Sequence, residues 1–144
     1  MKKLLIIVVV AMLYVGTVNN ASYAVGETVA VSQNSEQLLA EAYKTQRSDF
    51  QVQGTASVIK LLPDDNNGSR HQRFLVRLSS GQTLLIAHNT SLAARIDDLK
   101  EKDSVEFYGE YEWNNKGGVI HWTHRDPKGH HASGWIKHAD RTFQ

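Results

Sequence analysis

The sequence predicts a mainly β fold: a small five-stranded OB-like barrel with one helix between the third and fourth strands and a second helix at its N-terminus. Alternating apolar residues mark strand-like segments between residues 50 and 124, and turn-forming residues separate them. A stretch of helical periodicity stands between the third and fourth of these segments. Three strands, a helix and two strands is the element order of the OB-fold, a partly open Greek-key barrel.

The first 24 residues have the pattern of a secretory signal peptide. Lys2 and Lys3 precede an apolar run over residues 4–15, and Ser22 and Ala24 supply the small residues of a cleavage site. The run is shorter than the roughly 20 residues that a membrane-spanning helix needs. We therefore expect cleavage after Ala24 and export through the secretory pathway, to the periplasm or the medium. The mature form is expected to have no stable membrane span.

Composition narrows the classes of function. Residues 1–24 contain two lysines and no acidic residue, so their removal changes the formal net charge from +1 to −1. Bulk charge therefore argues against a polybasic nucleic-acid binder. All seven histidines lie in the mature chain and would make it cationic near pH ~6. The chain has no cysteine, which excludes disulfides, thiolate metal ligands and a cysteine nucleophile.

The mature chain is expected to begin with a tether over residues 25–34, which are small and polar. A helix is predicted near residues 35–46, where Leu38, Leu39 and Ala42 recur at helical spacing. The expected division of the chain is a signal peptide (1–24), a tether and helix (25–49), and an OB-like barrel domain with a C-terminal extension (50–144).

The first three strands are predicted between residues 50 and 89. The first begins at Phe50 and alternates apolar and polar residues, and Gly54 within it suggests a bulge where the strand bends. The turn-rich segment 63–69 leads to the second strand, whose Phe74 and Val76 should face the core. A turn over residues 79–82 then leads to the third strand.

The second half of the barrel contains the predicted internal helix and two further strands. Leu92, Ile96 and Leu99 follow the i, i+4, i+7 spacing of a short amphipathic helix over residues 92–100. A fourth strand alternates up to Trp113, and a hairpin turn leads to a fifth strand over residues 119–124. On that strand, alternation predicts Ile120 and Trp122 inside the barrel and His121 and Thr123 outside.

The predicted topology brings histidines from separate strands to one rim of the barrel. The turn at 79–82 sets His71 level with residues 88–90 on the third strand. In an OB barrel the third and fifth strands run in parallel, so residues 87–89 should approach residues 121–124. The set expected at this rim, with its neighbours, is His71, His88, Asn89, His121, His124, Arg70, Arg125 and Asp126.

Four motifs resemble a known family. "RHQRFLVRL", "LLIAHN", "GEYEWNNKGGVIHWTHRDP" and "GWI" together are similar to an uncharacterised family of small secreted bacterial proteins, a domain of unknown function. The resemblance covers roughly residues 50–138, and its GVIHWTHxDP core is the most specific part. It implies an exported bacterial protein and implies no activity.

Ligand binding without chemistry is the first of three functional hypotheses. OB barrels hold oligosaccharides or single-stranded nucleic acid across one face, and a protein partner is a further alternative. Glutamates at 106, 110 and 112 share the face of Tyr108 and would repel a phosphate chain, which favours a glycan or a protein there. The candidate ligand-binding residues are Arg70, His71, Arg73, Arg77 and Tyr108.

Hydrolysis of phosphodiesters is the second hypothesis. His88 and His121 would act as general base and general acid, Arg125 would stabilise the developing charge, and Asn89 would position the substrate. This chemistry requires neither cysteine nor metal. The sequence leaves open whether the protein is an enzyme.

A divalent transition metal such as zinc is the third hypothesis. Imidazole nitrogens are common ligands of zinc, copper and nickel. The candidate ligands are His71, His88, His121, His124 and Asp126. The HWTH motif, however, has no recognised zinc-binding spacing. The remaining histidines, His130, His131 and His138, are expected to be solvated in a loop or tail.

Overall fold

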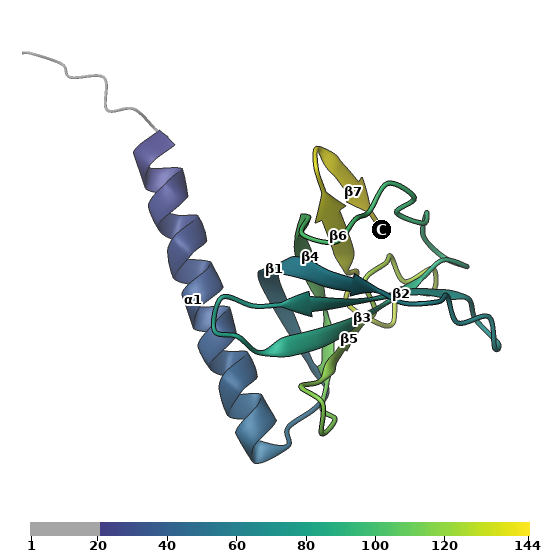
Figure 1. Cartoon of the computed structure of the whole chain (residues 1–144), viewed down its shortest axis with the longest axis horizontal. Helices are drawn as coiled ribbons and strands as arrows, with labels where there is room; N and C mark the ends of the chain where they lie inside the picture. Colours follow the sequence, from purple (N-terminus) through teal and green to yellow (C-terminus); the bar gives the residue numbers. More distant parts are fainter. Residues whose placement is uncertain (1–20) are drawn as a thin grey trace, which may run out of the picture.

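The computed structural model describes residues 21–144 and contains one helix and one seven-stranded sheet (Figure 1). The elements are α1 (Ala21–Thr45), β1 (Phe50–Leu61), β2 (His71–Arg77), β3 (Thr83–Asn89), β4 (Ser104–Glu112), β5 (Val119–His121), β6 (Trp135–His138) and β7 (Arg141–Phe143). Five strands pair in the order β1-β2-β3-β5-β4, and β4 pairs back with β1, which closes a barrel. The predicted OB-like barrel is confirmed.

Strand pairing follows the predicted register closely. His71 lies opposite Asn89 across β2 and β3, and β3 and β5 run in parallel with Ile86 beside Ile120. Gly54 sits in β1 because a Cβ there would lie 2.6 Å from the Phe107 ring, so its lack of a side chain makes room for that ring in the core. The ladder irregularity falls between Val58 and Lys60, not at Gly54 as expected.

The predicted helix over residues 92–100 is absent, and this segment consists of turns. Two of the three apolar residues that predicted the helix still point inward, since Ile96 and Leu99 are buried, whereas Leu92 is exposed. Long-range contacts occupy its backbone: the Gln72 amide donates to the Ile96 carbonyl and accepts from the Ile96 N–H, both at 2.9 Å. His88 binds the Ala94 carbonyl. These side chains satisfy backbone groups that a helix would have paired internally.

Helix α1 begins at Ala21, so the tether predicted for residues 25–34 is wrong and that segment is helical. Most of the predicted signal peptide, residues 1–20, lies outside the described residues. Leu39 and Ala42 are buried against the barrel. The Glu36 carboxylate accepts hydrogen bonds from the N–H and Oγ–H of Ser79 and from the N–H of Ser80, at 2.8–3.1 Å. No helix within residues 21–144 is long and apolar enough to cross a membrane.

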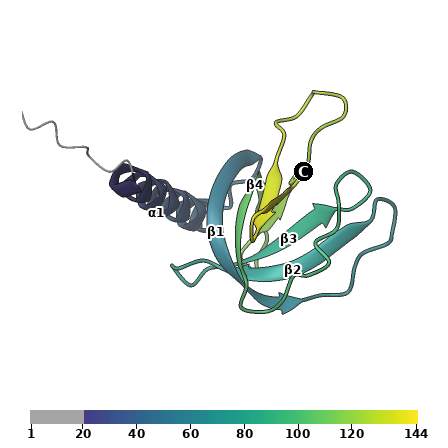
Figure 2. The same ribbon diagram turned by 90° about the horizontal axis from the view of Figure 1, so that it is seen from above.

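The barrel is therefore closed at both ends by different segments. Helix α1 covers the end at the β2–β3 turn, and residues 92–100 cover the end where β3 finishes (Figure 1). Figure 2 shows the barrel from above, with α1 beside β1. Between these covers lies the core, whose largest fully buried side chains include Phe74, Leu84, Ile86, Phe107, Tyr111, Ile120 and Ile136.

The C-terminal extension forms a hairpin that the sequence did not reveal. Strand β6 pairs with β4 over Val105–Tyr108, next to the stretch Glu110–Glu112 with which β5 pairs. Strands β5 and β6 thus follow one another along a single edge of β4, and residues 122–134 form the loop between them. Strands of three or four residues are too short for alternation to stand out in a sequence.

Candidate functional site

The outer face of β4 and β5 carries a group of acidic and imidazole side chains, which we call the Glu110 cluster: Glu110, Glu112, His121 and His131. Tyr111 and Ile120 point into the barrel, so their neighbours Glu110 and His121, paired across the two strands, point outward. The His121 Nε2 lies 3.3 Å from Glu110 Oε1, and the His131 Nε2 lies 2.7 Å from Glu110 Oε2. One carboxylate thus lies between two imidazole rings, hydrogen-bonded to His131 and facing His121.

His131 enters the cluster from the loop 122–134. Its Nδ1 donates to the Ala132 carbonyl at 2.8 Å, and its ring stacks on Trp122 with centroids 4.0 Å apart. Burial lowers the pKa of His131, but the hydrogen bond to Glu110 and the Ala132 carbonyl outweigh it, so the net pKa is raised. The expectation that His131 is merely solvated is wrong. No local sequence pattern could reveal it, because the loop has to fold back onto β4.

The conformation of Trp122 explains how the chain leaves β5. Its φ is +54°, a left-handed conformation that is rare for an aromatic residue. Strand β5 therefore ends at His121, and the predicted alternation fails beyond it. Trp122 lies half-buried against His131, while Thr123 is fully buried, the reverse of the predicted arrangement. Backbone strain of this kind gathers at functional sites.

His88 lies inside the barrel wall, with its side chain fully buried. Its Nε2 donates to the Ala94 carbonyl at 3.1 Å, which leaves Nδ1 to accept from the Thr123 hydroxyl at 2.9 Å. Burial, reinforced by the nearby His124 and His71, lowers the pKa of His88 to about 4. His88 therefore faces the interior of the barrel, whereas His121 faces its outer surface.

His71 lies opposite Asn89, the residue that follows His88 in β3. His124 directly follows Thr123, whose hydroxyl donates to His88. The three histidines therefore lie at the same rim of the barrel. His71 donates from Nδ1 to the Ser69 carbonyl, and the buried His124 donates from Nδ1 to the Arg125 carbonyl, both at 2.8 Å. His121, on the outer face, does not share their surroundings. These contacts give His71 and His124 a role in fixing loops.

Asp126 and Asn89 at this rim also form hydrogen bonds with backbone groups of the neighbouring loops. Asp126 accepts the N–H groups of Lys128, His130 and His131, and these bonds, the Lys128 bond foremost, lower its pKa. The Asn89 Oδ1 accepts the Ser91 N–H at 2.9 Å, and the Arg70 N–H donates to the Ser91 hydroxyl. Arg125 is exposed.

The predicted ligand-binding residues fall on two different walls. Arg73 and Arg77 lie on the outer face of β2, where Arg73 donates from Nε and Nη2 to the Pro63 carbonyl. Tyr108 lies on β4, tilted against Trp135 with centroids 6.2 Å apart. The acidic face that carries Tyr108 is therefore separate from the basic face of β2.

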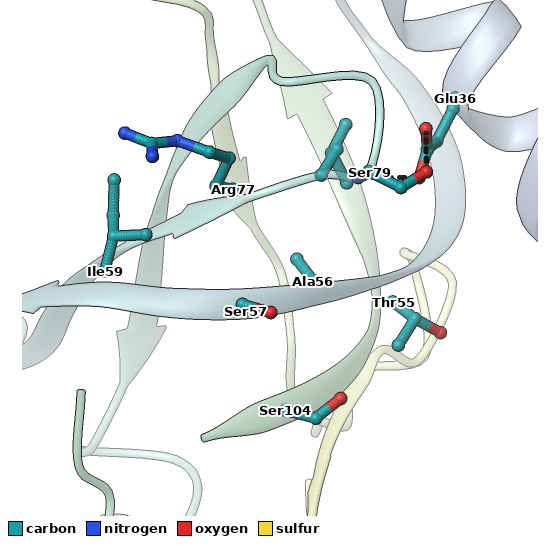
Figure 3. A pocket seen from close by; sticks show the side chains of 9 residues that line it. Glu36, Thr55, Ala56, Ser57, Ile59, Arg77, Ser79 and Ser104 are labelled. Atoms are coloured by element: carbon teal, nitrogen blue, oxygen red, sulfur yellow. Dashed lines mark hydrogen bonds between the residues drawn. The ribbon is translucent and has the colours of Figure 1, made fainter. Parts of the chain in front are cut away.

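The structure reveals two hollows on the basic side that no sequence motif marks. The first, of about 450 Å³, lies between α1, β1 and β2 and includes Ile59 and Arg77 (Figure 3). The second, of about 240 Å³, is lined by Leu62, Leu75, Thr83, Leu85, Asn114, Lys116 and Gly118. Arg77 of the first hollow pairs with Thr83 of the second across β2 and β3, so the two hollows are neighbours.

Within residues 21–144, no three His, Asp or Glu side chains are already arranged as ligands of a single ion.

Comparison with known proteins gives a family. No curated protein matches the chain. The family described as "Protein of unknown function (DUF3465)" matches residues 22–144, which is the whole of the barrel together with nearly all of α1. The chain therefore belongs to the DUF3465 family.

Proposed function

We propose that this protein is an exported binding module that holds an anionic linear oligomer, in the first place single-stranded nucleic acid, across the outer face of β1, β2 and β3. The Arg77–Thr83 pair supports this proposal best, because it joins the two hollows into one strip that crosses three strands. The face of strands 2 and 3, with its adjoining loops, is where OB barrels bind oligonucleotides and oligosaccharides.

The side chains of this strip suit an anionic chain with apolar parts. Arg77 and Lys116 provide positive charge at the two hollows, and Leu75 and Leu85 provide an apolar floor. Glu36 carries the one carboxylate among the residues that line the two hollows, and it is already engaged by Ser79 (Figure 3) and by the N–H of Ser80. The strip has leucines where nucleic-acid binders often have aromatic rings, so we expect charge to dominate affinity and sequence preference to be weak.

Removing both cations should weaken binding and reduce its dependence on salt. For the double variant Arg77→Gln/Lys116→Gln, the slope of log K against log salt with oligo(dT) should fall by about 1.4, because each lost phosphate contact contributes about 0.7 for single strands. Fluorescence anisotropy over a salt series measures this slope. Lys128→Gln, which removes an exposed lysine from the loop 122–134, should behave as wild type.

Parallel titrations identify the source of the negative charge. A sulfated oligosaccharide that binds more tightly than oligo(dT) of equal charge would replace nucleic acid by an anionic glycan as the ligand. Equal affinity of wild type and the double variant, or binding that does not respond to salt, would refute the strip as the binding surface.

Export is supported by the charged start, apolar run and small residues of the N-terminus. In a bacterial host that expresses the full chain, the protein should accumulate in the periplasm or the medium with Val25 as its first residue. Intact-mass measurement of each fraction tests this. A cytoplasmic protein that retains residues 1–24 would contradict export.

Phosphodiester hydrolysis and metal binding, with the residues that the sequence suggests for them, gain no support from the positions of those residues. His88 and His121 cannot flank one phosphodiester, because the wall of the barrel lies between them. A metal held by His71, His88, His121, His124 and Asp126 would need His88 and Asp126 to give up the hydrogen bonds that occupy them. Binding without chemistry is therefore the function we propose.

A further inference from the structure

We propose that Glu110, Glu112 and His121 bind a divalent transition-metal ion of the zinc class on the outer face of β4 and β5. This site lies on the acidic wall, apart from the strip on β1, β2 and β3, and it uses a different ligand set from the one the sequence suggests. It does not rest on the proposed oligomer binding.

The first support is the unusual environment of the His121 Nε2. This atom is buried, yet it has no hydrogen-bond partner among the described residues. It lies 3.3 Å from Glu110 Oε1 and 3.5 Å from Glu112 Oε2. Two ligands of a tetrahedral zinc ion, each about 2.1 Å from the metal, lie about 3.4 Å from one another. The spacing is thus that of ligands which share an ion.

The second support is the way Glu110 is held. Its Oε2 accepts from the His131 Nε2 at 2.7 Å, while its Oε1 faces His121. The His131 ring is itself fixed by the Ala132 carbonyl and by stacking on Trp122. Carboxylates that ligate metals are oriented by such second partners. His131 is therefore a positioning residue for the ligand Glu110.

Glu112 has to move for the site to close. As placed, the three groups do not yet surround one point. The Glu112 side chain is 59% exposed, so it is free to change rotamer and bring its carboxylate onto the ion. The fourth position then faces solvent and is left for water or a ligand, as in open zinc sites.

The ligand chemistry selects the class of metal. Two carboxylates attract any divalent cation, but an imidazole nitrogen favours zinc and its neighbours over magnesium and calcium, which prefer oxygen ligands throughout. The two negative charges of Glu110 and Glu112 balance the charge of a divalent ion.

Zinc titration of tag-free, chelator-treated protein tests the proposal. Isothermal titration calorimetry should show one ion per chain, and Co²⁺ should give the visible absorption of a four-coordinate site. Affinity for Zn²⁺ should fall at least about tenfold in His121→Gln and in Glu112→Gln. His130→Gln, which changes an exposed histidine of the same loop, should leave affinity unchanged.

Three results would overturn the site: no stoichiometric binding, equal loss of affinity in His130→Gln, or Ca²⁺ binding as tight as Zn²⁺ binding. Glu112 is exposed, so Glu112→Gln keeps the test valid even if changes at His121 disturb the fold. Oligo(dT) binding measured in chelator reports on the strip alone, so failure of one proposal is distinguishable from failure of the other.

Discussion

Replacing Gly117 by alanine is expected to lower the free energy of unfolding by more than about 3 kcal/mol, whereas alanine at Gly81 should cost only about 1 kcal/mol. Both glycines have a left-handed φ, +119° at Gly117 and +89° at Gly81. They differ in their surroundings. A Cβ on Gly117 would collide with the Thr83 carbonyl oxygen, whereas a Cβ on Gly81 would meet nothing within 4 Å.

The turn at Gly117 has little freedom to move away from this collision. Its carbonyl accepts hydrogen bonds from the buried Tyr111 hydroxyl at 3.1 Å and from the Gln82 amide at 2.9 Å. The next residue, Gly118, accepts the Leu85 N–H through its own carbonyl. A shift that relieved the collision would break bonds in the core and beside the second hollow, so the cost of alanine cannot relax away.

Urea unfolding followed by circular dichroism measures both variants. The pair separates backbone conformation from collision, because only the first contributes at Gly81. Equal destabilisation of the two variants would show that the Thr83 contact relaxes freely and that the turn is softer than its hydrogen bonds indicate.

The folded chain is also expected to lose stability in acid through His88, by about 3 kcal/mol between pH ~6.5 and ~4. Burial lowers the pKa of His88 from 6.5 to about 4 in the folded state. In this window the unfolded chain binds a proton that the folded chain excludes, so protonation favours unfolding. The contribution of His88 is therefore fully present above pH ~6.5 and is lost as the pH falls towards ~4.

His88→Gln isolates this contribution from those of other acids and histidines. Glutamine keeps polar atoms near Thr123 and Ala94 but does not titrate, so the variant should show a shallower fall in unfolding free energy over the same pH range. NMR of the wild-type ring adds a direct check: the His88 signals should not titrate above pH ~5. A wild-type ring that titrates near 6.5 would show that His88 is open to water.

Local alternation and topology were sufficient to predict the barrel and part of its rim. The period-2 pattern marked the five barrel strands, and the parallel pairing of β3 with β5 followed from their order. The length of the turn over residues 79–82 predicted that His71 lies opposite residues 88–90, and it pairs with Asn89. These features depend on residues near one another in the chain or on the general geometry of such barrels.

The features that escaped prediction depend on distant partners. Residues 92–100 have helical spacing, but the Gln72 side chain takes the backbone groups of Ile96 and keeps the segment in turns. The left-handed Trp122 reverses the faces of the residues after β5, and His131 joins Glu110 from across a loop. A sequence records the residues of such contacts but not their meeting in space.

Strands β5 and β6 lie on one edge of β4, and the chain leaves that edge after His121 and returns at Trp135. The Gly134 N–H donates to the His124 carbonyl at 2.9 Å and ties the base of this excursion. Thr123 and His124 at the start of the excursion are buried, whereas its tip, residues 127–130, is exposed. That tip can be lengthened, shortened or exchanged without shifting the strand pairing. The barrel therefore carries a replaceable segment in the manner of an antibody framework, where variation accumulates in a loop while its scaffold stays constant.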